Sequence, residues 1–323
     1  MLFIGEEDVL RAASLREIIE ALERAQIDQS IGRAKNLPRR RIYGEAYTLH
    51  LMASSLENED VAGLKTYLST KQRTVFVVLL FSLSRSELLA VIEADILGRL
   101  RTGAASAVAS KYLARKDSSI IGIVGSGRQA FTQALALSEI FSPEKVLVYS
   151  REKANAEKMS SILMGKGIKS NTCENLRELF MKSDVISTAT NSRDPFITLD
   201  LIRRGLHINL VGSNHPNRAE AYPEIFGSAN LVVTDDLEQA KIESGDLIKA
   251  VEKGFIKWES IYELWQVVSG RVSRASPDQV TIFKSHGIAL WDLALAKLIY
   301  EKARREGFGV EIDFKGFWSD RYF

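Results

Sequence analysis

A glycine-containing turn between two short apolar runs constrains the fold of this chain more than any other feature of its sequence. The run Ile120–Val124 leads into Gly125-Ser126-Gly127-Arg128-Gln129-Ala130, a helical segment follows to about residue 140, and the apolar run 146–149 closes the unit. A strand, a glycine turn, a helix and a second strand within about 30 residues form the pattern typical of dinucleotide binding. The alternative interpretation is a glycine turn in an ordinary α/β unit.

The residues of this turn fit the contacts that a dinucleotide pyrophosphate requires. Gly125 permits the tight turn, and Gly127 lets backbone N–H groups approach the phosphates. Ala130 stands in place of the third glycine and still allows close packing of helix on strand. The helix that follows presents its unpaired N–H groups and the positive end of its dipole to the phosphates. We therefore predict cofactor contacts from Gly125, Ser126, Gly127, Arg128 and Gln129.

The end of the second strand indicates which nicotinamide dinucleotide is bound. NAD-binding proteins usually place an acidic residue there for the ribose 2′-hydroxyl, whereas an arginine accommodates the 2′-phosphate of NADP. This chain has Ser150 and Arg151 at that point, with Lys153 just beyond, and its first carboxylate is Glu152. Because a hydroxyl and a guanidinium suit a phosphate dianion, the sequence favours NADP(H) as the cofactor and leaves NAD(H) as the alternative.

Composition limits the class of protein. With 323 residues, 46% of them hydrophobic, the chain is long enough for two domains with cores of their own. Its net charge of +2 argues against a nucleic-acid platform, which normally carries a basic excess. No apolar run reaches the roughly 18 residues of a membrane span, and the acidic N-terminus does not resemble a signal peptide. The single cysteine, Cys173, cannot form an internal disulfide, which fits a cytoplasmic protein, and no metal site is predicted.

The first third of the chain is predicted to be an α+β domain. Ser14-Leu15-Arg16-Glu17 has the form of a capping box, and apolar residues at helical spacing continue to about residue 31. Strands are expected over 45–52, 61–68, 74–82 and 88–92, with polar turns between them, which predicts an antiparallel or mixed sheet. The run Arg39-Arg40-Arg41 precedes these strands and is interpreted either as an anion-binding group or as a solvated loop.

A helix rich in small residues is expected over 95–114. Gly98 and Gly103 within it each cost about 1 kcal/mol relative to alanine, which indicates a packing or binding role for this surface. Arg101 lies in the same segment, as a surface charge or as a clamp for an anion.

From Ser119 onward, strands alternate with helices, which indicates a Rossmann-type doubly wound parallel sheet. Strands are expected at 119–124, 145–150, 168–172, 184–188, 206–211, 230–234 and 280–283, and a helix over 235–250. The amphipathic helix 287–304 is long enough to return to the first domain. The predicted fold class is therefore α/β, with a Rossmann domain over 115–289 and an α+β domain formed by 1–114 with 290–323.

Two strand ends of the Rossmann sheet are candidate ligand-binding loops. Ligands in doubly wound sheets lie beyond the carboxyl ends of the strands. One strand ends in Thr188-Ala189-Thr190, and another ends in Val211-Gly212-Ser213-Asn214. We predict cofactor contacts there from Thr188, Ala189, Thr190, Val211 and Gly212.

Several blocks, in a fixed order and spacing, match one family of proteins. They are Ala62 to Lys65, Leu100 to Ala105, the glycine turn, His207 to Ser213, Asp235 to Ala240, and Thr281 to Ala289 with Asp292 behind it. By these blocks the chain resembles the ornithine cyclodeaminase/mu-crystallin family, which includes cyclodeaminases, archaeal alanine dehydrogenases, ketimine reductases and opine-type synthases. The resemblance implies a homodimer built through the first domain, with the substrate held between the two domains. It also places Thr102 and Ser285 among the cofactor contacts.

The resemblance further implies that basic residues hold a substrate carboxylate, and by motif these fall on Arg40, Lys65 and Arg101. A bidentate arginine grips a carboxylate with defined geometry, which agrees with an α-imino, α-keto or α-amino acid as substrate. With three arginines in a row, a shift of one residue replaces Arg40 by Arg39 or Arg41. Lys65 is also assigned a catalytic role, with a surface lysine as the alternative.

One position departs from the family pattern in a way that bears on the chemistry. Cyclodeaminases and archaeal alanine dehydrogenases have an aspartate where this chain has Asn214. An aspartate can take a proton from a substrate amine or an attacking water, whereas an asparagine can only orient and hydrogen bond. Mu-crystallin-like ketimine reductases also lack the aspartate. Asn214, predicted as a catalytic residue, therefore favours reduction of a preformed imine over cyclisation of ornithine.

The sequence thus predicts an NAD(P)H-dependent oxidoreductase that reduces an α-imino acid, with cyclic ketimines such as pyrroline-2-carboxylate or piperideine-2-carboxylate as the leading substrates. An iminium brings its own proton, so the protein needs to orient it and hold its carboxylate rather than supply a base. His215 and His286 are candidate proton relays, with packing histidines as the alternative. Alanine dehydrogenase, ornithine cyclodeaminase, and a non-catalytic protein that binds NADP and a small carboxylate remain the alternatives.

Overall fold

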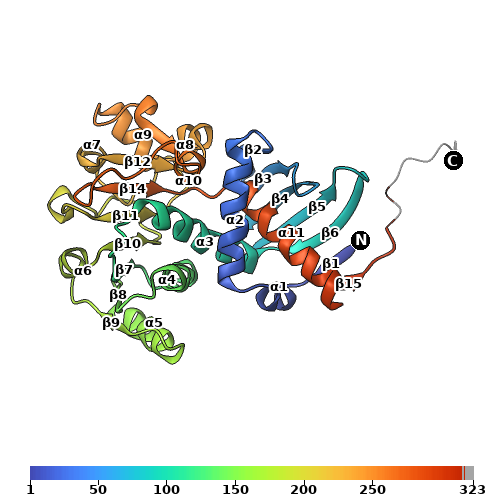
Figure 1. Ribbon diagram of the computed structural model, residues 1–323, viewed down its shortest axis with the longest axis horizontal. Helices are drawn as coiled ribbons and strands as arrows, with labels where there is room; N and C mark the ends of the chain where they lie inside the picture. The colour runs from blue at the N-terminus through green and yellow to red at the C-terminus, as the bar shows by residue number, and fades with distance from the viewer. Residues whose placement is uncertain (315, 317–323) are drawn as a thin grey trace. The chain divides into compact units, whose positions relative to one another are not determined.

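The computed structural model describes residues 1–314 and 316, and the chain divides into two compact units. Unit 1 comprises Met1–Arg101 and Ile288–Phe323, and unit 2 comprises Thr102–Gly287. Figure 1 labels the elements of both. The helix α3 (Asp95–Leu113) contains one boundary between the units, and the domain limits expected from the sequence, after 114 and 289, stay a prediction. In the described part of the chain, no helix has both the length and the apolar character needed to cross a membrane.

Unit 1 is built on a mixed sheet. Its described strands lie in the order β15-β1-β6-β5-β4-β3-β2. Strands β2 to β6 pair antiparallel in sequence order, while β1 lies parallel to β6. The strands are β1 (Leu2–Ile4), β2 (Ala34–Tyr43), β3 (Tyr47–Leu56), β4 (Val61–Thr70), β5 (Thr74–Ser82), β6 (Glu87–Glu93) and β15 (Val310–Glu311).

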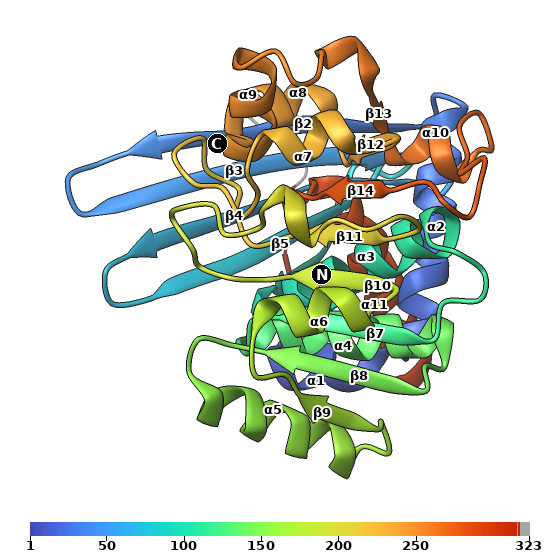
Figure 2. The ribbon, with the colours of Figure 1, turned by 90° about the vertical axis from the view of Figure 1, so that its left-hand side faces the viewer.

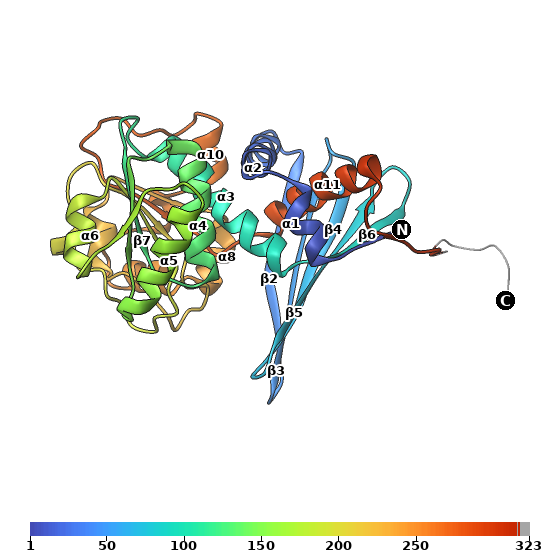
Figure 3. The ribbon, with the colours of Figure 1, turned by 90° about the horizontal axis from the view of Figure 1, so that it is seen from below.

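Helices of unit 1 lie on one face of this sheet, as Figure 3 shows for α1 (Glu6–Ala12), α2 (Leu15–Ser30) and α11 (Ala289–Glu306). The capping box predicted for α2 is confirmed, because Ser14 Oγ accepts from Glu17 N while the Glu17 carboxylate accepts from Ser14 N. The helix α11 packs across β3, β4 and β5, and its Trp291 is fully buried. The covered face of the sheet is therefore the core of unit 1.

The other face of the same sheet exposes apolar side chains. Leu37, Leu51, Leu68 and Val75 are between 39% and 52% exposed, and they come from four neighbouring strands. Leu68 and Val75 lie opposite each other in the register of β4 and β5. An apolar surface of this kind is typical of a protein contact rather than of a surface that faces water.

Strand β2 is the main element that the sequence analysis did not expect. It lies at the edge of the sheet. An edge strand tolerates a proline such as Pro38, which has no N–H group to donate to a neighbouring strand. The register slips between Leu37 and Arg40, which leaves Pro38 and Arg39 opposite a single residue of β3, Met52. Such a β-bulge changes which side chains point to which face. Here it turns Arg39 to the covered face and leaves Arg40 exposed.

Unit 2 confirms the predicted Rossmann-type sheet. Its described strands lie in the order β13-β12-β14-β11-β10-β7-β8-β9 and pair parallel throughout (Figure 2). The order reverses between β7 and β10, which is the switch point where a dinucleotide binds in such sheets. The strands are β7 (Ile120–Val124), β8 (Lys145–Tyr149), β9 (Ser170–Thr172), β10 (Val185–Thr188), β11 (His207–Leu210), β12 (Leu231–Thr234), β13 (Ile261–Glu263) and β14 (Thr281–Lys284). The α-helices are α4 (Arg128–Phe141), α5 (Lys153–Gly165), α6 (Leu176–Lys182), α7 (Glu224–Ser228), α8 (Leu237–Glu243), α9 (Gly245–Glu252) and α10 (Leu264–Val268).

The single helix predicted over 235–250 is wrong, because the structure has two helices there. Ser244 ends α8, and its side chain accepts from Leu247 N to cap α9. A Cβ on Gly245 would lie 2.0 Å from Arg218 O, so the break lets another loop approach the backbone closely.

Candidate active site

A buried cluster of charged side chains in unit 1 joins residues from distant parts of the sequence. Lys65 extends from β4 to the covered face of the sheet, and Asp292 lies in the first turn of α11. Lys65 Nζ donates to Asp292 Oδ1 at 2.8 Å, and both side chains are almost fully buried. The positive end of the helix dipole stabilises a carboxylate at this position. Lys65 is therefore not a surface lysine, and its partner is a residue to which the sequence analysis gave no role.

Arg101 reaches the same carboxylate from α3. Its Nε donates to Asp292 Oδ1 at 3.1 Å, so one oxygen atom accepts from both Lys65 and Arg101. Arg101 Nη1 and Asp292 Oδ2 are buried and have no hydrogen-bond partner among the described residues. Leaving a buried polar group unsatisfied costs about 1–3 kcal/mol, and more when it is charged. The cluster thus offers an unfilled donor to an anion.

Arg39 lies on the same side of the sheet as Lys65. Arg39 is buried and its Nε donates to Met52 Sδ at 3.3 Å, while Met52 is the cross-strand neighbour of Lys65. Arg40, which the sequence analysis assigned to the substrate, is exposed on the other face. The structure therefore brings together Arg39, Lys65 and Arg101 and leaves Arg40 apart. The sequence signal for this is Pro38, because proline inside a strand is typical of a bulge.

The environment of Lys65 changes its acidity. Burial lowers the pKa of Lys65 from 10.5 to about 8; the Asp292 carboxylate opposes the fall, and the positive charges of Arg101 and Arg39 add to it. The backbone of α3 passes close to the ammonium group, since a Cβ on Gly98 would lie 2.7 Å from Lys65 Nζ. A glycine at position 98 therefore leaves room for the Lys65 ammonium group against the helix.

The glycine turn of unit 2 has the geometry that a pyrophosphate requires. Gly125 has φ +116°, and a Cβ there would lie 2.6 Å from Ala189 O, so only glycine fits. A Cβ on Gly127 would meet nothing within 4 Å, which leaves open space at the start of α4. Gly127 is the N-cap of α4 and makes no side-chain cap hydrogen bond, which is the kind of helix N-terminus at which phosphates bind. The residues present fit a dinucleotide.

The end of β8 presents a hydroxyl pair and a cation. Ser126 Oγ donates to Ser150 Oγ at 3.0 Å, which ties the glycine turn to the end of the second strand. Lys153 is paired with Glu174 at 2.9 Å. Arg151 is exposed and makes no hydrogen bond or ion pair with any described residue. Of the two basic residues, Arg151 is the one open to a ligand.

The remaining predicted cofactor residues lie at the carboxyl edge of the sheet of unit 2 or near it. Thr188, Thr190 and Gly212 all donate to one buried carboxylate, Glu220, which the sequence analysis missed. Ala189 and Val211 hydrogen bond through their backbones to neighbouring strand ends, Val124 and Thr188. Thr102 is buried at the start of unit 2 and its carbonyl accepts from Gln133, while Arg128 and Gln129 open α4.

The end of β14 is organised by a second buried carboxylate. Asp235 Oδ2 accepts from Ser285 Oγ at 3.2 Å and from His286 N and Gly287 N, each at 2.6 Å. Its Oδ1 lies 2.9 Å from His286 Nδ1. Burial alone would raise the pKa of Asp235. The contacts above, of which those with the His286 ring have the largest effect, instead lower this pKa to about 2. The Ser285 hydroxyl is therefore oriented by the protein, and His286 is held by a carboxylate.

Asn214 lies in the loop after β11 and is half buried. Next to it, His215 lines an open pocket of unit 2 with Arg193, Asp194, Asn217 and Arg218. Asn214 thus lies at the edge of the sheet where the predicted cofactor residues gather, beside a polar hollow rather than inside the core. Among the described residues no group of His, Cys, Asp and Glu is arranged to hold a metal ion.

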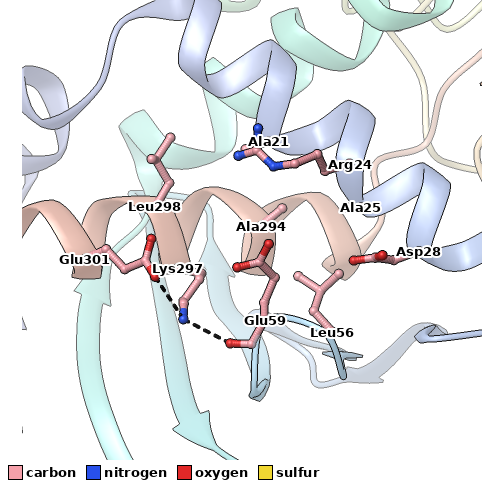
Figure 4. Close-up of a pocket in the computed structure, with 10 residues that line it drawn as sticks. All are labelled: Ala21, Arg24, Ala25, Asp28, Leu56, Glu59, Ala294, Lys297, Leu298 and Glu301. Atoms are coloured by element: carbon pink, nitrogen blue, oxygen red, sulfur yellow. Dashed lines mark hydrogen bonds and ion pairs between the residues drawn. The ribbon is translucent and has the colours of Figure 1, made fainter.

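A further pocket lies in unit 1 between α2 and α11 (Figure 4). Two basic side chains, Arg24 and Lys297, line it, and Lys297 Nζ donates to Glu59 O at 3.0 Å and lies 3.1 Å from Glu301 Oε1. None of the predicted site residues lines it. We assign it no part in the chemistry.

Comparison with known proteins identifies the family. The profile of the ornithine cyclodeaminase/mu-crystallin family matches residues 2–307. The chain belongs to the ornithine cyclodeaminase/mu-crystallin family. Within it, the chain is 36% identical to an alanine dehydrogenase of Archaeoglobus fulgidus, over 97% of this chain and 98% of that protein. It is 32% identical to a Δ1-pyrroline-2-carboxylate reductase of Bacillus cereus, over 97% of this chain and 100% of that protein.

Solved structures of the ornithine cyclodeaminase/mu-crystallin type confirm the fold. The Δ1-pyrroline-2-carboxylate reductase of Thermococcus litoralis, in complex with NADH and L-proline, matches with a TM-score of 0.91 and 36% identity, covering 97% of this chain and 100% of that one. An archaeal alanine dehydrogenase dimer with bound NAD matches with a TM-score of 0.91 and 34% identity, covering 97% and 99%. The family and the fold class predicted from the sequence are both confirmed.

Proposed function

We propose that this protein reduces a cyclic α-imino acid, of the pyrroline-2-carboxylate or piperideine-2-carboxylate class, to the corresponding amino acid with NAD(P)H. The observation that carries the proposal is the buried cluster in which Lys65 and Arg101 share one oxygen of Asp292. Two positive charges and one negative charge leave this trio with an excess of one, and Arg101 Nη1 still lacks an acceptor. A monocarboxylate supplies both the missing charge and the missing acceptor.

In this proposal, Arg39, Lys65 and Arg101 make different contributions to binding of the substrate carboxylate. Arg101 donates to the substrate carboxylate through its open N–H group, and Arg39 contributes a further guanidinium on the same side of the sheet. Lys65, held by Asp292, supports the same carboxylate, and its ammonium group can donate a proton to an imine that arrives unprotonated. The residues of the glycine turn of unit 2 would hold the nicotinamide cofactor, and the chemistry that this group would supply is hydride transfer.

The absence of a carboxylate at position 214 argues against cyclodeamination. Deprotonating an ornithine amine requires a base near the reacting carbon, and Asn214 cannot accept a proton near neutral pH. Reduction of an iminium has no such requirement, because the substrate already carries the proton that stays on nitrogen. Asn214 can then orient the imine by hydrogen bonding. Residues 211–214, Val-Gly-Ser-Asn, include no carboxylate.

The relatives support the class of activity. That the chain is an NAD(P)-dependent oxidoreductase is confirmed by its match to reductases and dehydrogenases over almost its full length. The neighbour from Thermococcus litoralis holds L-proline, the product that pyrroline-2-carboxylate reduction gives. Alanine dehydrogenase is the second candidate, because the relative from Archaeoglobus fulgidus is equally similar at 36% identity. The alanine dehydrogenase reaction requires proton transfers during the addition of ammonia to pyruvate. Asn214 cannot act as the base in these transfers.

We further propose NADP(H) as the preferred cofactor and a cytoplasmic homodimer as the working form. Arg151 at the end of β8 is the open cation for a 2′-phosphate. The exposed apolar face of unit 1 supports a self-association surface. The one cysteine, Cys173, is buried, and burial raises the pKa of its thiol to about 11, so it stays a protonated packing residue.

The test is NADPH oxidation followed at 340 nm with pyrroline-2-carboxylate and piperideine-2-carboxylate, beside pyruvate plus ammonia and beside ornithine plus NAD. We expect fast turnover with at least one cyclic ketimine and slow or no turnover with the other two mixtures. Faster turnover of pyruvate plus ammonia identifies an alanine dehydrogenase instead. If the protein binds NADPH and a carboxylate but turns over none of these mixtures, it is a binding protein and not an enzyme.

A pair of variants on α3 ties the activity to the cluster. Arg101→Ala removes the open donor and should abolish turnover or raise KM for the ketimine about tenfold or more, with NADPH binding kept. Arg99→Ala removes the same charge two residues earlier, where Arg99 only pairs with Asp95 at 2.8 Å. Equal kinetics for the two variants would remove Arg101 from the site.

A further inference from the structure

Glu220 is a buried carboxylate to which the ends of two neighbouring strands are tied. It lies in the chain after β11 and is fully buried. Its Oε1 accepts from Thr190 N at 3.0 Å and from Thr190 Oγ1 at 2.7 Å. Its Oε2 accepts from Thr188 Oγ1 at 2.7 Å and from Gly212 N at 2.8 Å. Three of these four donors come from the end of β10 and one from the end of β11.

The surrounding backbone is shaped for this contact. A Cβ on Gly212 would lie 2.2 Å from Glu220 Oε1, so a side chain there would push the carboxylate away. The segment that carries Glu220 is itself fixed, because Glu220 N and Ala221 N donate to Asp246 Oδ1 at 2.8 and 3.0 Å. Asp246 thus fixes the backbone of Glu220, while the Glu220 carboxylate binds the ends of β10 and β11.

A buried ion pair holds the next residue of the same loop. Lys284 Nζ lies 2.9 Å from Asp246 Oδ2 and donates to Ser213 O at 2.8 Å, and both charged side chains are fully buried. The loop after β11 is therefore fixed at Gly212 by Glu220 and at Ser213 by Lys284, immediately before Asn214. Burying charges carries a penalty of several kcal/mol per ion unless they are well paired. Stability alone is a weak reason for placing three of them in one region.

The position of this network in the sheet indicates what it serves. The half of the sheet formed by β7 and β8 carries the glycine turn and Arg151, so it takes the pyrophosphate and the adenosine end of the cofactor. The strands β10 and β11 lie beyond the switch point, in the half that takes the other mononucleotide. Glu220 therefore controls the loops that face the nicotinamide end.

We propose that Glu220 is a positioning residue for the nicotinamide end of the cofactor, acting through Thr190, Gly212 and the loop that carries Asn214. The inference rests on the proposed function only in taking the bound dinucleotide to be NAD(P)H. Replacing one oxygen of Glu220 by an NH2 group removes an acceptor for two donors and loosens the loops. The adenosine end, bound on β7 and β8, keeps its contacts.

The test compares the wild-type protein with Glu220→Gln. NADPH binding is followed by nicotinamide fluorescence and 2′,5′-ADP binding by calorimetry, with NADH and AMP as the second pair, and kcat and KM are measured with the ketimine. We expect the Kd of NADPH to rise and kcat to fall, each about tenfold or more, since small misplacements of reacting groups lower rates strongly. The Kd of 2′,5′-ADP should stay within about twofold.

The matched control is Asp184→Asn. Asp184 Oδ2 accepts from Ser119 N and Ile120 N, each at 3.0 Å, at the opposite, amino edge of the same sheet. This control should lower Tm while kcat and the Kd of NADPH stay unchanged. If Glu220→Gln also lowers only Tm, or weakens 2′,5′-ADP as much as NADPH, Glu220 is structural and the proposal fails.

Two further outcomes remain informative. If Glu220→Gln does not fold, Thr190→Val is measured in the same way, because it removes only one of the four donors to Glu220. We expect this variant to raise the Kd of NADPH by less than Glu220→Gln would. An unchanged Kd of NADPH would overturn the proposal. If the wild-type protein binds NADPH but reduces no imine, the proposed substrate is wrong, while the comparison of NADPH with 2′,5′-ADP still decides the role of Glu220.

Discussion

Arg39 and Arg40 are adjacent in the chain but lie on opposite faces of β2, and this separation can be tested directly. Arg39→Ala removes a guanidinium beside Lys65, and we expect KM for the ketimine to rise about tenfold, as for the loss of a hydrogen bond to a charged group. Arg40→Ala removes the same charge from the exposed face and should leave KM within about twofold. A larger effect for Arg40→Ala would restore the assignment made from the motif.

Lys65 gives the carboxylate site a dependence on pH. Its pKa of about 8 means that the ammonium form, which attracts a carboxylate, is lost as pH rises above 8. We expect the inhibition constant of pyrrole-2-carboxylate, an anion whose charge is constant in this range, to rise about tenfold between pH 7 and 9.5. Lys65→Arg keeps its charge throughout and should flatten the profile. An unchanged wild-type constant across this range would remove Lys65 from the anion site.

Arg151 decides the cofactor in our proposal. Arg151→Asp replaces the open cation at the end of β8 by an acid suited to a ribose 2′-hydroxyl, so preference should shift from NADPH toward NADH. The ratio of kcat/KM for the two cofactors measures the shift, and we expect a change of at least tenfold. Lys153→Ala is the control, because Lys153 pairs with Glu174. A ratio that moves equally in both variants contradicts the assignment.

Single residues differ in how far the sequence can reveal them. Gly125 and Gly127 act within one local turn, so their spacing alone indicates their role. Asp292 meets Lys65 across 227 positions, and its partnership appears only once the chain has folded. Glu220 gathers its donors from two strand ends, and no local pattern marks a buried carboxylate of this kind. The glycine turn could therefore be recognised from the sequence, whereas the contacts of the buried carboxylates Asp292 and Glu220 could not.

At the scale of elements, the two glycines of α3 lie against different surroundings, Gly98 against the Lys65 side chain and Gly103 against the backbone of Thr132. Gly98→Ala adds a Cβ 2.7 Å from the flexible end of Lys65, so KM for the ketimine should rise severalfold while Tm is kept or raised, since alanine favours a helix by about 1 kcal/mol. Gly103→Ala adds a Cβ 2.6 Å from the backbone oxygen of Thr132 and should lower Tm instead. Thermal unfolding and steady-state kinetics on both variants check this contrast.

The elements that were hard to predict share a physical cause. Strand β2 carries a proline and three arginines, and its bulge breaks the alternation that a strand normally shows. The helix pair α8 and α9 has continuous helical composition, but close approach of the loop at Arg218 requires the break before Gly245. In both places a tertiary contact overrides the local pattern. The strands β7, β8, β10, β11, β12 and β14 of the Rossmann unit repeat a local pattern without such interruptions, and they were predicted, whereas the short strand β13 was not.

At the scale of the whole molecule, the exposed apolar face of unit 1 predicts self-association. Leu51 lies on β3, a middle strand of that face, and is 39% exposed. The substitution Leu51→Glu places a charge on this face. We expect the wild-type protein to elute at twice the 36.0 kDa of the chain and the variant at the mass of a monomer. Leu10→Glu, on α1 and 64% exposed, is the control and should not change the mass. A monomeric wild-type protein contradicts the homodimer.

The position of Asp292 in the sequence determines when unit 1 can be completed during synthesis. Unit 2 is one uninterrupted stretch, Thr102–Gly287, so all of its strands are available to fold before synthesis ends. Unit 1 waits for α11, because Lys65 and Arg101 have no carboxylate to share until residue 292 has been made. We therefore expect the nascent protein to complete unit 2 first and the proposed carboxylate site of unit 1 last. A chain that ends after Gly287 is expected to keep the fold of unit 2 but to lack Asp292.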